Sequence, residues 1–83
     1  MPNTEFKYTV TEPIAVLYQK GASTKEINLV SYNDKEPQYD IRHWQLVINR
    51  NTGEENKLLR KGIALTLEEA KTLKAVLNSR PEL

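Results

Sequence analysis

Arg42 and Trp44 are separated by a single residue in a segment whose polar and apolar residues alternate as in a β-strand. Alternation puts both side chains on the same strand face, so a cation would lie beside a flat π surface. This pairing suits a flexible polyanion with accessible bases, as single-stranded nucleic acid is. An outward arginine beside a tryptophan that packs in the core or against a partner subunit fits these two residues equally well. One face of this strand would carry Asp40, Arg42 and Trp44, and the opposite face would carry Tyr39, Ile41 and His43.

Arg60 and Lys61 supply two further cations immediately before Gly62. Adjacent strand residues point to opposite faces, so one cation would reach a phosphate and the other would face solvent, unless Gly62 bends the chain. Lys57 could extend the same phosphate-binding surface. A lysine that is simply exposed to solvent is the alternative. These residues are candidates for phosphate contacts.

Tyr32 ends an expected strand directly before the polar turn 33–37. At that position its ring could stack on a base, an interaction that contributes about 1–3 kcal/mol without demanding sequence. A half-buried tyrosine at the rim of a sheet is the alternative. We interpret Tyr8, Tyr18 and Tyr39 as sheet or interface residues.

The sequence contains no arrangement that predicts catalysis. It has no cysteine and a single histidine, which excludes a disulfide scaffold and a Cys-ligated metal site. The pair Glu54–Glu55 has no evident third metal ligand, and no glycine-rich phosphate loop or serine–histidine–acid set is present. Asp40 is better interpreted as orienting Arg42 than as a general base, and His43 as a packed or solvent-lined residue. We therefore expect a non-enzymatic protein without cofactor or metal.

Periodicity and turn residues predict an α+β fold with four strands and one C-terminal helix. Pro13 interrupts the first strand pattern, which predicts one bent strand or two short ones at an edge. Gly21 and Gly53 mark turns, and Gly62 marks a bend or bulge. The strands are expected at residues 6–19, 25–32, 38–48 and 57–65.

The helix has the clearest start signal. Thr66 and Glu69 form a capping box, in which each side chain bonds the backbone N–H of the other. An apolar stripe then follows at helical spacing. It could cover the sheet of its own chain or pair with a second copy. The stripe consists of Leu67, Ala70, Leu73, Val76 and Leu77.

Bulk properties are compatible with several functions. The 83 residues predict one domain, spanning 1–83, and a chain of this size without cysteines often gains core by oligomerising. The net charge of +1 is not the strongly basic balance of an obvious DNA-binding protein. The longest apolar run, Ile14–Leu17, is far too short to span a membrane, and the N-terminus lacks a signal-peptide pattern. We expect a cytoplasmic protein, with association with the nucleoid as one option.

The sequences YDIRHW and RKGIAL also carry a resemblance. They resemble the DIR…W and RKGISL-type motifs of the positive cofactor four family of transcriptional coactivators, and most closely its small bacterial, YdbC-type branch. The similarity extends over residues 6–78. It implies a homodimer of β-β-β-β-α subunits with paired helices, whose curved sheets form a groove for single-stranded DNA with little sequence preference.

The resemblance assigns roles to particular residues. It implies that Arg42, Arg60 and Lys61 hold phosphates and that Tyr32 and Trp44 stack on bases. Single-stranded RNA would also bind, because such contacts read neither the 2′-hydroxyl nor the sequence strongly. A protein-interaction module of the same fold without a nucleic-acid ligand is the rival hypothesis, and the small net charge favours it.

Overall fold

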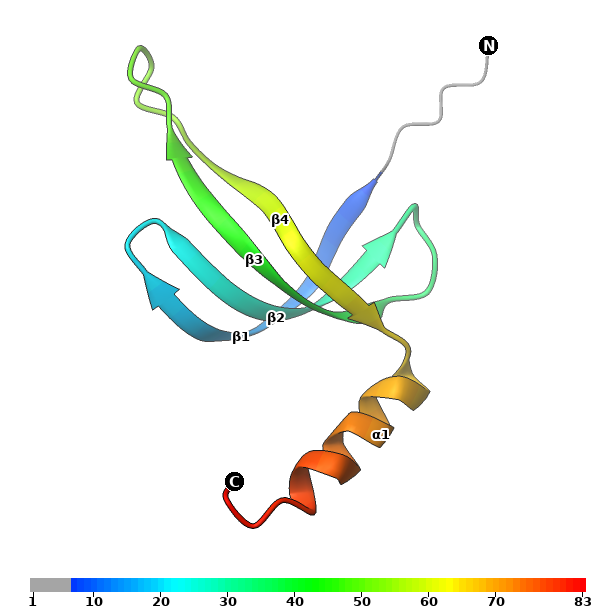
Figure 1. Cartoon of the computed structure of the whole chain (residues 1–83). Coiled ribbons are helices and arrows are strands. Elements are labelled where there is room, and N and C mark those ends of the chain that lie inside the picture. Colours follow the sequence, from blue (N-terminus) through cyan, green and yellow to red (C-terminus); the bar gives the residue numbers. More distant parts are fainter. Residues whose placement is uncertain (1–6) are drawn as a thin grey trace.

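A computed structural model of the chain, which describes residues 7–83, shows a four-stranded antiparallel sheet followed by one helix (Figure 1). The strands lie in sequence order, β1-β2-β3-β4, so every connection is a hairpin. This confirms the expected α+β fold class. The elements are β1 (Tyr8–Lys20), β2 (Ser23–Tyr32), β3 (Gln38–Ile48), β4 (Glu55–Leu65) and α1 (Leu67–Asn78).

β1 is a single strand, which decides between the two alternatives left open by Pro13. Its pairing with β2 shifts register three times, and one shift lies directly after Pro13. Such bulges are tolerated because β1 is an edge strand, and they bend it around the sheet. The predicted first position of this strand, Phe6, lies outside the described residues.

Residues in the left-handed backbone region shape the turns. Asn33 and Asp34 have φ of 53° and 61°, and the Lys35 N–H donates to the Tyr32 carbonyl at 3.0 Å. Asn and Asp tolerate this region better than other side chains, so the pair makes a tight β2–β3 turn. Gly53, at φ 75°, has the same role in the β3–β4 loop. Tyr32 is thereby fixed at the end of β2.

The sheet interior is largely polar. Among the described residues, the buried hydrophobic side chains are Val30 and Trp44, whereas Glu26, Asn28 and Asp40 are also buried. All of these residues lie on the central strands β2 and β3. A single chain therefore has little apolar core of its own.

The helix α1 extends away from the sheet at the end of β4 (Figure 1). The predicted capping box is present: the Glu69 N–H donates to Thr66 Oγ1 at 3.2 Å, and the Thr66 N–H donates to Glu69 Oε1 at 2.9 Å. None of the helix residues is buried. The apolar stripe thus remains largely uncovered within one chain.

Candidate nucleic-acid interface

The register of the sheet confirms the predicted division of β3 into two faces. Asp40, Arg42 and Trp44 alternate with Tyr39, Ile41 and His43, and the strand pairs with β2 over eight residues without a shift. The six candidate residues separate into two neighbouring groups. Tyr32 and Arg42 belong to a buried polar cluster, whereas Trp44, Arg60 and Lys61 line an open hollow, and Lys57 lies over the Trp44 ring.

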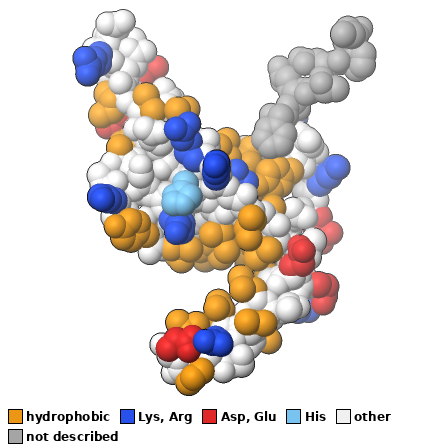
Figure 2. All heavy atoms as spheres, viewed as in Figure 1, with side chains coloured by type: hydrophobic (Ala, Val, Ile, Leu, Met, Phe, Trp, Pro, Cys, Tyr) orange, Lys and Arg blue, Asp and Glu red, His pale blue; other side chains and the backbone are white. Residues whose placement is uncertain are grey.

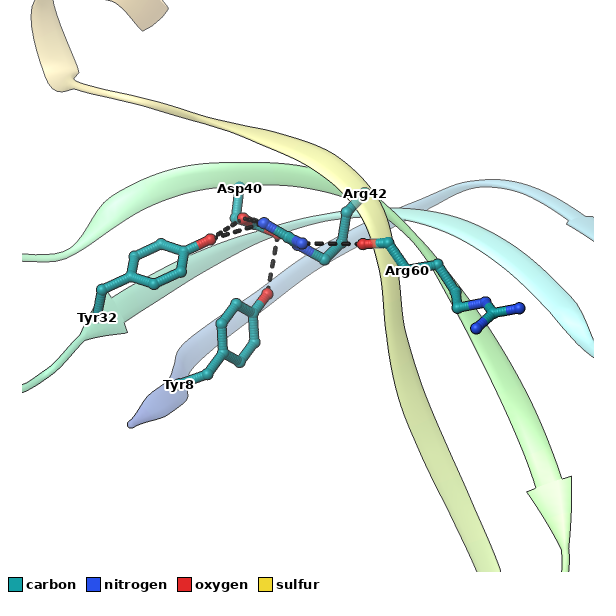
Figure 3. Close-up of polar contacts among 5 residues, drawn as sticks. All are labelled: Tyr8, Tyr32, Asp40, Arg42 and Arg60. Carbon is teal, nitrogen blue, oxygen red and sulfur yellow. Dashed lines mark hydrogen bonds and ion pairs between the residues drawn. The ribbon is translucent and has the colours of Figure 1, made fainter. Parts of the chain in front are cut away.

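Asp40 is the centre of the buried cluster, which we call the tyrosine–carboxylate cluster and define as Tyr8, Tyr32, Asp40 and Arg42 (Figure 3). Its carboxylate has no exposed surface and accepts hydrogen bonds from both tyrosine hydroxyls. The Tyr8 bond measures 2.9 Å. Arg42 donates from Nε and Nη2 to the two carboxylate oxygens at 2.7 Å each, a bidentate ion pair. This buried charge is therefore fully paired.

Arg42 is correspondingly occupied within its own chain. Beyond Asp40, it donates to the Tyr32 hydroxyl at 2.8 Å and to the Arg60 carbonyl at 2.9 Å. These contacts use most of the five N–H donors of a guanidinium, and only 16% of the side chain is exposed. The predicted orientation of Arg42 by Asp40 agrees with this geometry. The expected phosphate contact of Arg42 stays a prediction, and the guanidinium points inward toward Asp40 (Figure 3).

The electrostatics of the cluster fix its protonation at neutral pH. Burial alone would raise the pKa of Asp40, but the hydrogen bonds from Arg42, Tyr32 and Tyr8 outweigh it and lower that pKa. Burial and the nearby carboxylate raise the pKa of both tyrosines, while the hydrogen bond to Asp40 raises the pKa of Arg42. The cluster thus holds an ion pair and two neutral phenols over the neutral range.

The two tyrosine rings of the cluster and the ring of Trp44 form a row of three aromatic side chains. Tyr8 lies edge-on to Tyr32, with ring centroids 5.2 Å apart, and edge-on to Trp44, at 5.6 Å. Edge-to-face contacts of this kind stabilise ring orientation. Trp44 is only 8% exposed, so its indole packs in the sheet and offers little surface to a base. Of the two alternatives for Trp44, this burial favours the packed ring. Stacking on a base stays a prediction for Trp44 and for Tyr32, which is half-buried.

Lys57 is positioned by a second buried carboxylate. Its Nζ lies 5.2 Å from the centroid of the Trp44 ring and 2.7 Å from Glu26 Oε2. Burial opposes ionisation of Glu26, but the bonds from Lys57 and Thr24 outweigh it and lower its pKa. Half of the Lys57 side chain is exposed. Lys57 can therefore contact a ligand, although Glu26 neutralises part of its charge.

A β-bulge sets the position of the remaining cations. Between the pairs Arg42–Gly62 and Trp44–Leu59, β4 has two residues where β3 has only His43. Such a bulge bends the strand and redirects its side chains. The predicted irregularity at Gly62 is therefore present.

The two bulged residues, Arg60 and Lys61, both line one open hollow of 770 Å³. His43, Ser23 and Gln45 also line it, whereas no aspartate or glutamate of the described part of the chain does. We call this site the bulge hollow. The exception that the sequence left open, a bend at Gly62, therefore applies, and the bulge brings both cations to the same hollow.

Gly62 is required where it stands. A Cβ at this position would lie 1.9 Å from the Arg42 Cβ and 2.5 Å from the Ile41 carbonyl oxygen. The two strands approach so closely here that no side chain fits. The same glycine therefore permits the bulge and fixes Arg42 against the backbone of β4.

Sequence reasoning missed Tyr8 as a member of the cluster. It was interpreted as a sheet or interface residue, because nothing local links it to Asp40, 32 residues along the chain. Its alternation with the strand residues that follow it assigns Tyr8 to one face of the strand, but does not identify Asp40 as its partner. Glu26 was missed for the same reason: its partner, Lys57, lies 31 residues away.

Two searches of the described residues bear on other functions. Residues 7–83 contain no group of three or more His, Cys, Asp or Glu side chains that could hold a metal ion. Within the same range, no helix is long and apolar enough to cross a membrane.

Comparison with known proteins adds no family assignment. A scan against models of protein families finds none that matches this chain, and a search of curated proteins finds no match either. The functional argument therefore rests on the residues and their geometry.

Proposed function

We propose that this protein is a non-enzymatic single-stranded DNA-binding protein with little sequence specificity that acts as a homodimer in transcription regulation. The observation that carries the proposal is the bulge hollow. It gathers Arg60 and Lys61 beside Trp44 on an open surface without a carboxylate. Cations of this kind neutralise phosphates and provide most of the affinity for a nucleic acid, independently of sequence.

The aromatic rings of the tyrosine–carboxylate cluster support a single-stranded ligand. Tyr32 and Tyr8 are held in fixed orientations by Asp40, so little side-chain entropy is lost when a base stacks on them. A duplex hides the faces of its bases, whereas a single strand exposes them. The resemblance of YDIRHW and RKGIAL to the positive cofactor four motifs supports the same function.

The direct test is a titration of fluorescently labelled oligo-dT and of a duplex of the same length. We expect tighter binding of oligo-dT, because only its bases can reach the tyrosine rings. Equal or tighter binding of the duplex would contradict the proposal. A single-stranded RNA of the same length then measures the preference between DNA and RNA.

Trp44 provides an internal probe, since it is the only tryptophan. It lines the bulge hollow, so bound nucleic acid should change its fluorescence even if the ring does not stack. An unchanged emission spectrum at saturating oligo-dT would place the ligand elsewhere.

The homodimer is supported by the surface that one chain leaves uncovered. Leu73, Val76 and Leu77 of α1 and Ile63 of β4 are exposed, and an apolar groove of 480 Å³ separates the helix from the sheet. A contiguous exposed apolar surface of this kind is characteristic of an interface. A second copy would supply the core that the single chain lacks.

Sedimentation equilibrium at micromolar concentration tests this part. We expect a dimer, and Leu73→Asp should weaken association by placing a charge on the stripe. A monomeric parent protein would remove the dimer from the proposal. Thr72→Asp, which places the same charge at an exposed position of the same helix that does not line the groove, is the control.

The rival function is a protein-interaction module, and the apolar groove beside α1 is the observation that favours it. The two functions differ in salt dependence. Phosphate binding makes the logarithm of affinity fall linearly with the logarithm of salt concentration. Binding through the apolar groove would be nearly independent of salt.

A further inference from the structure

His43 has a position that neither its sequence context nor the proposed function explains. It is exposed and lies at the bulge, where β4 presents two residues to it. It lines the bulge hollow and also an adjoining hollow of 420 Å³ that it shares with Lys61. The imidazole is therefore at the centre of the open surface between β2, β3 and β4.

The charged side chains that face His43 are all cationic. β2 contributes Lys25, its direct cross-strand partner, and β4 contributes Arg60 and Lys61. Directly paired residues have Cβ atoms roughly 5 Å apart, so the Lys25 and His43 side chains are close neighbours. Among residues 7–83, no aspartate or glutamate lines either hollow. Figure 2 shows the single histidine, in pale blue, between lysine and arginine side chains in blue.

We propose that His43 belongs to the phosphate-binding surface and makes the affinity for single-stranded nucleic acid increase as the pH falls through the titration range of histidine. This inference rests on the proposed function, and it identifies a binding residue and a mode of regulation at the same site. The prediction from sequence treated His43 as packed or solvent-lined. The bulge adds to that interpretation because it brings two cations, Arg60 and Lys61, to the imidazole, beside Lys25 of β2.

The physical basis is proton linkage. A phosphodiester bound among these cations favours the protonated imidazole over the neutral one, because the protonated ring adds a positive charge and a second N–H donor. Binding therefore takes up a proton where histidine titrates, and affinity must rise as protons become more available. Histidine is the one side chain whose ordinary titration lies between about pH 5 and 8.

The two buried carboxylates lie on the opposite face of the sheet from His43 and titrate below this window. The pKa values of Asp40 and Glu26 are lowered below their ordinary carboxyl values by their hydrogen-bonded partners. Both carboxylates therefore stay ionised throughout the histidine range. A pH dependence of binding within that range can be assigned to His43 by substitution.

The test is a titration of labelled oligo-dT at constant salt from about pH 8 to about pH 5.5, with the full-length protein. We expect the parent protein to bind about three- to tenfold more tightly at the lower pH, the effect of a shift of about half to one unit in one proton equilibrium. His43→Gln should lose most of the gain in affinity that the parent shows on acidification. His43→Lys carries a permanent charge and should bind tightly at both values.

A second measurement reports on His43 directly. The chain has one histidine, so a single imidazole resonance follows its titration by nuclear magnetic resonance. We expect its midpoint to move to higher pH when oligo-dT is bound. The resonance also shows whether the protein stays folded across the range.

The outcomes separate this inference from the proposed function. Binding that is independent of pH, with an unmoved imidazole midpoint, overturns the role of His43 but leaves single-strand binding intact. An equal pH dependence in His43→Gln has the same consequence. No binding of oligo-dT at any pH overturns both.

Discussion

The tyrosine–carboxylate cluster and the bulge hollow are neighbours, but they satisfy their polar groups in opposite ways. In the cluster, Arg42 directs its donors to Asp40, Tyr32 and the Arg60 carbonyl, and the carboxylate is fully buried. In the hollow, Arg60 and Lys61 are exposed and face no carboxylate. A charge that is satisfied within the chain stabilises the fold, whereas a charge left to solvent remains available for a ligand.

This contrast reassigns the two arginines of the candidate site. Both are candidates for phosphate contacts in the sequence, and nothing in their local spacing separates them. The guanidinium of Arg42 lies with Asp40 and the two tyrosines, whereas the Arg60 side chain points away from them (Figure 3) and lines the hollow. The predictions below test this division, beginning with the largest expected effect.

Arg42→Ala should lower the free energy of unfolding by about 3–5 kcal/mol, because it leaves the buried Asp40 carboxylate without its ion-pair partner. Urea denaturation followed by circular dichroism measures this. Arg60→Ala is the matched control, and it should change stability by less than about 0.5 kcal/mol, as is usual for exposed positions. Equal stability of the two variants would remove the distinction between cluster and hollow.

Gly62→Ala should cost about 3 kcal/mol, since its Cβ would overlap Arg42 and the β3 backbone. Gly21→Ala is a control for the backbone alone. Gly21 has φ 58° but open space around it, so alanine there should cost only about 1–2 kcal/mol of left-handed strain. If Gly62→Ala proves the milder change, the close approach of β3 and β4 is not as the structure shows it.

Much of this arrangement follows from local sequence signals. The bounds of β3 and the capping box of α1 were predicted, because each is set by alternation or by residues within one turn. β2 and β4 each begin two residues earlier than expected, at Ser23 and Glu55. Strand ends depend on cross-strand pairing, which local patterns do not encode.

The candidate site was less predictable, for a physical reason. The partners of Asp40 and Glu26 come from strands about 30 residues away, so the sequence cannot show which cations they neutralise. Gly62 indicated an irregularity, but not that the irregularity would bring Arg60 and Lys61 into one hollow. Whether a cation can bind a ligand depends on whether a carboxylate from another strand already neutralises it.

Tyr8→Phe should lower the free energy of unfolding by about 1.5 kcal/mol at neutral pH, because it removes a hydrogen bond to a buried carboxylate but keeps the ring. Tyr18→Phe, at an exposed position of the same strand, is the control. Urea midpoints of the two variants and the parent measure the difference.

The same variant tests the protonation of the cluster. The folded pKa of Asp40 is lower than its ordinary value of 3.8, so its stabilising contribution is full above that value. The contribution is lost as the pH falls from 3.8 toward the lower folded pKa. The difference between Tyr8→Phe and the parent should therefore shrink in acid, and a constant difference would show that the bond does not depend on the Asp40 charge.

Lys61→Ala and Arg60→Ala should have the smallest effect on stability and a clear effect on binding. Each removes one phosphate contact from the hollow, which flattens the salt slope by about 0.7 for a single strand. At about 0.15 M salt, loss of one such contact weakens affinity about fourfold by the same relation. Oligo-dT titrations at several salt concentrations measure both quantities.

Lys74→Ala separates a localised site from general attraction between a polyanion and a cationic surface. Lys74 lies on α1 beside the apolar groove, away from the bulge hollow, and its loss changes the net charge of the chain by the same amount. If binding depends on the hollow, Lys74→Ala keeps the parent slope while Lys61→Ala does not. If the two variants flatten the slope equally, net charge governs the interaction, and the open cations of the bulge have no special role in it.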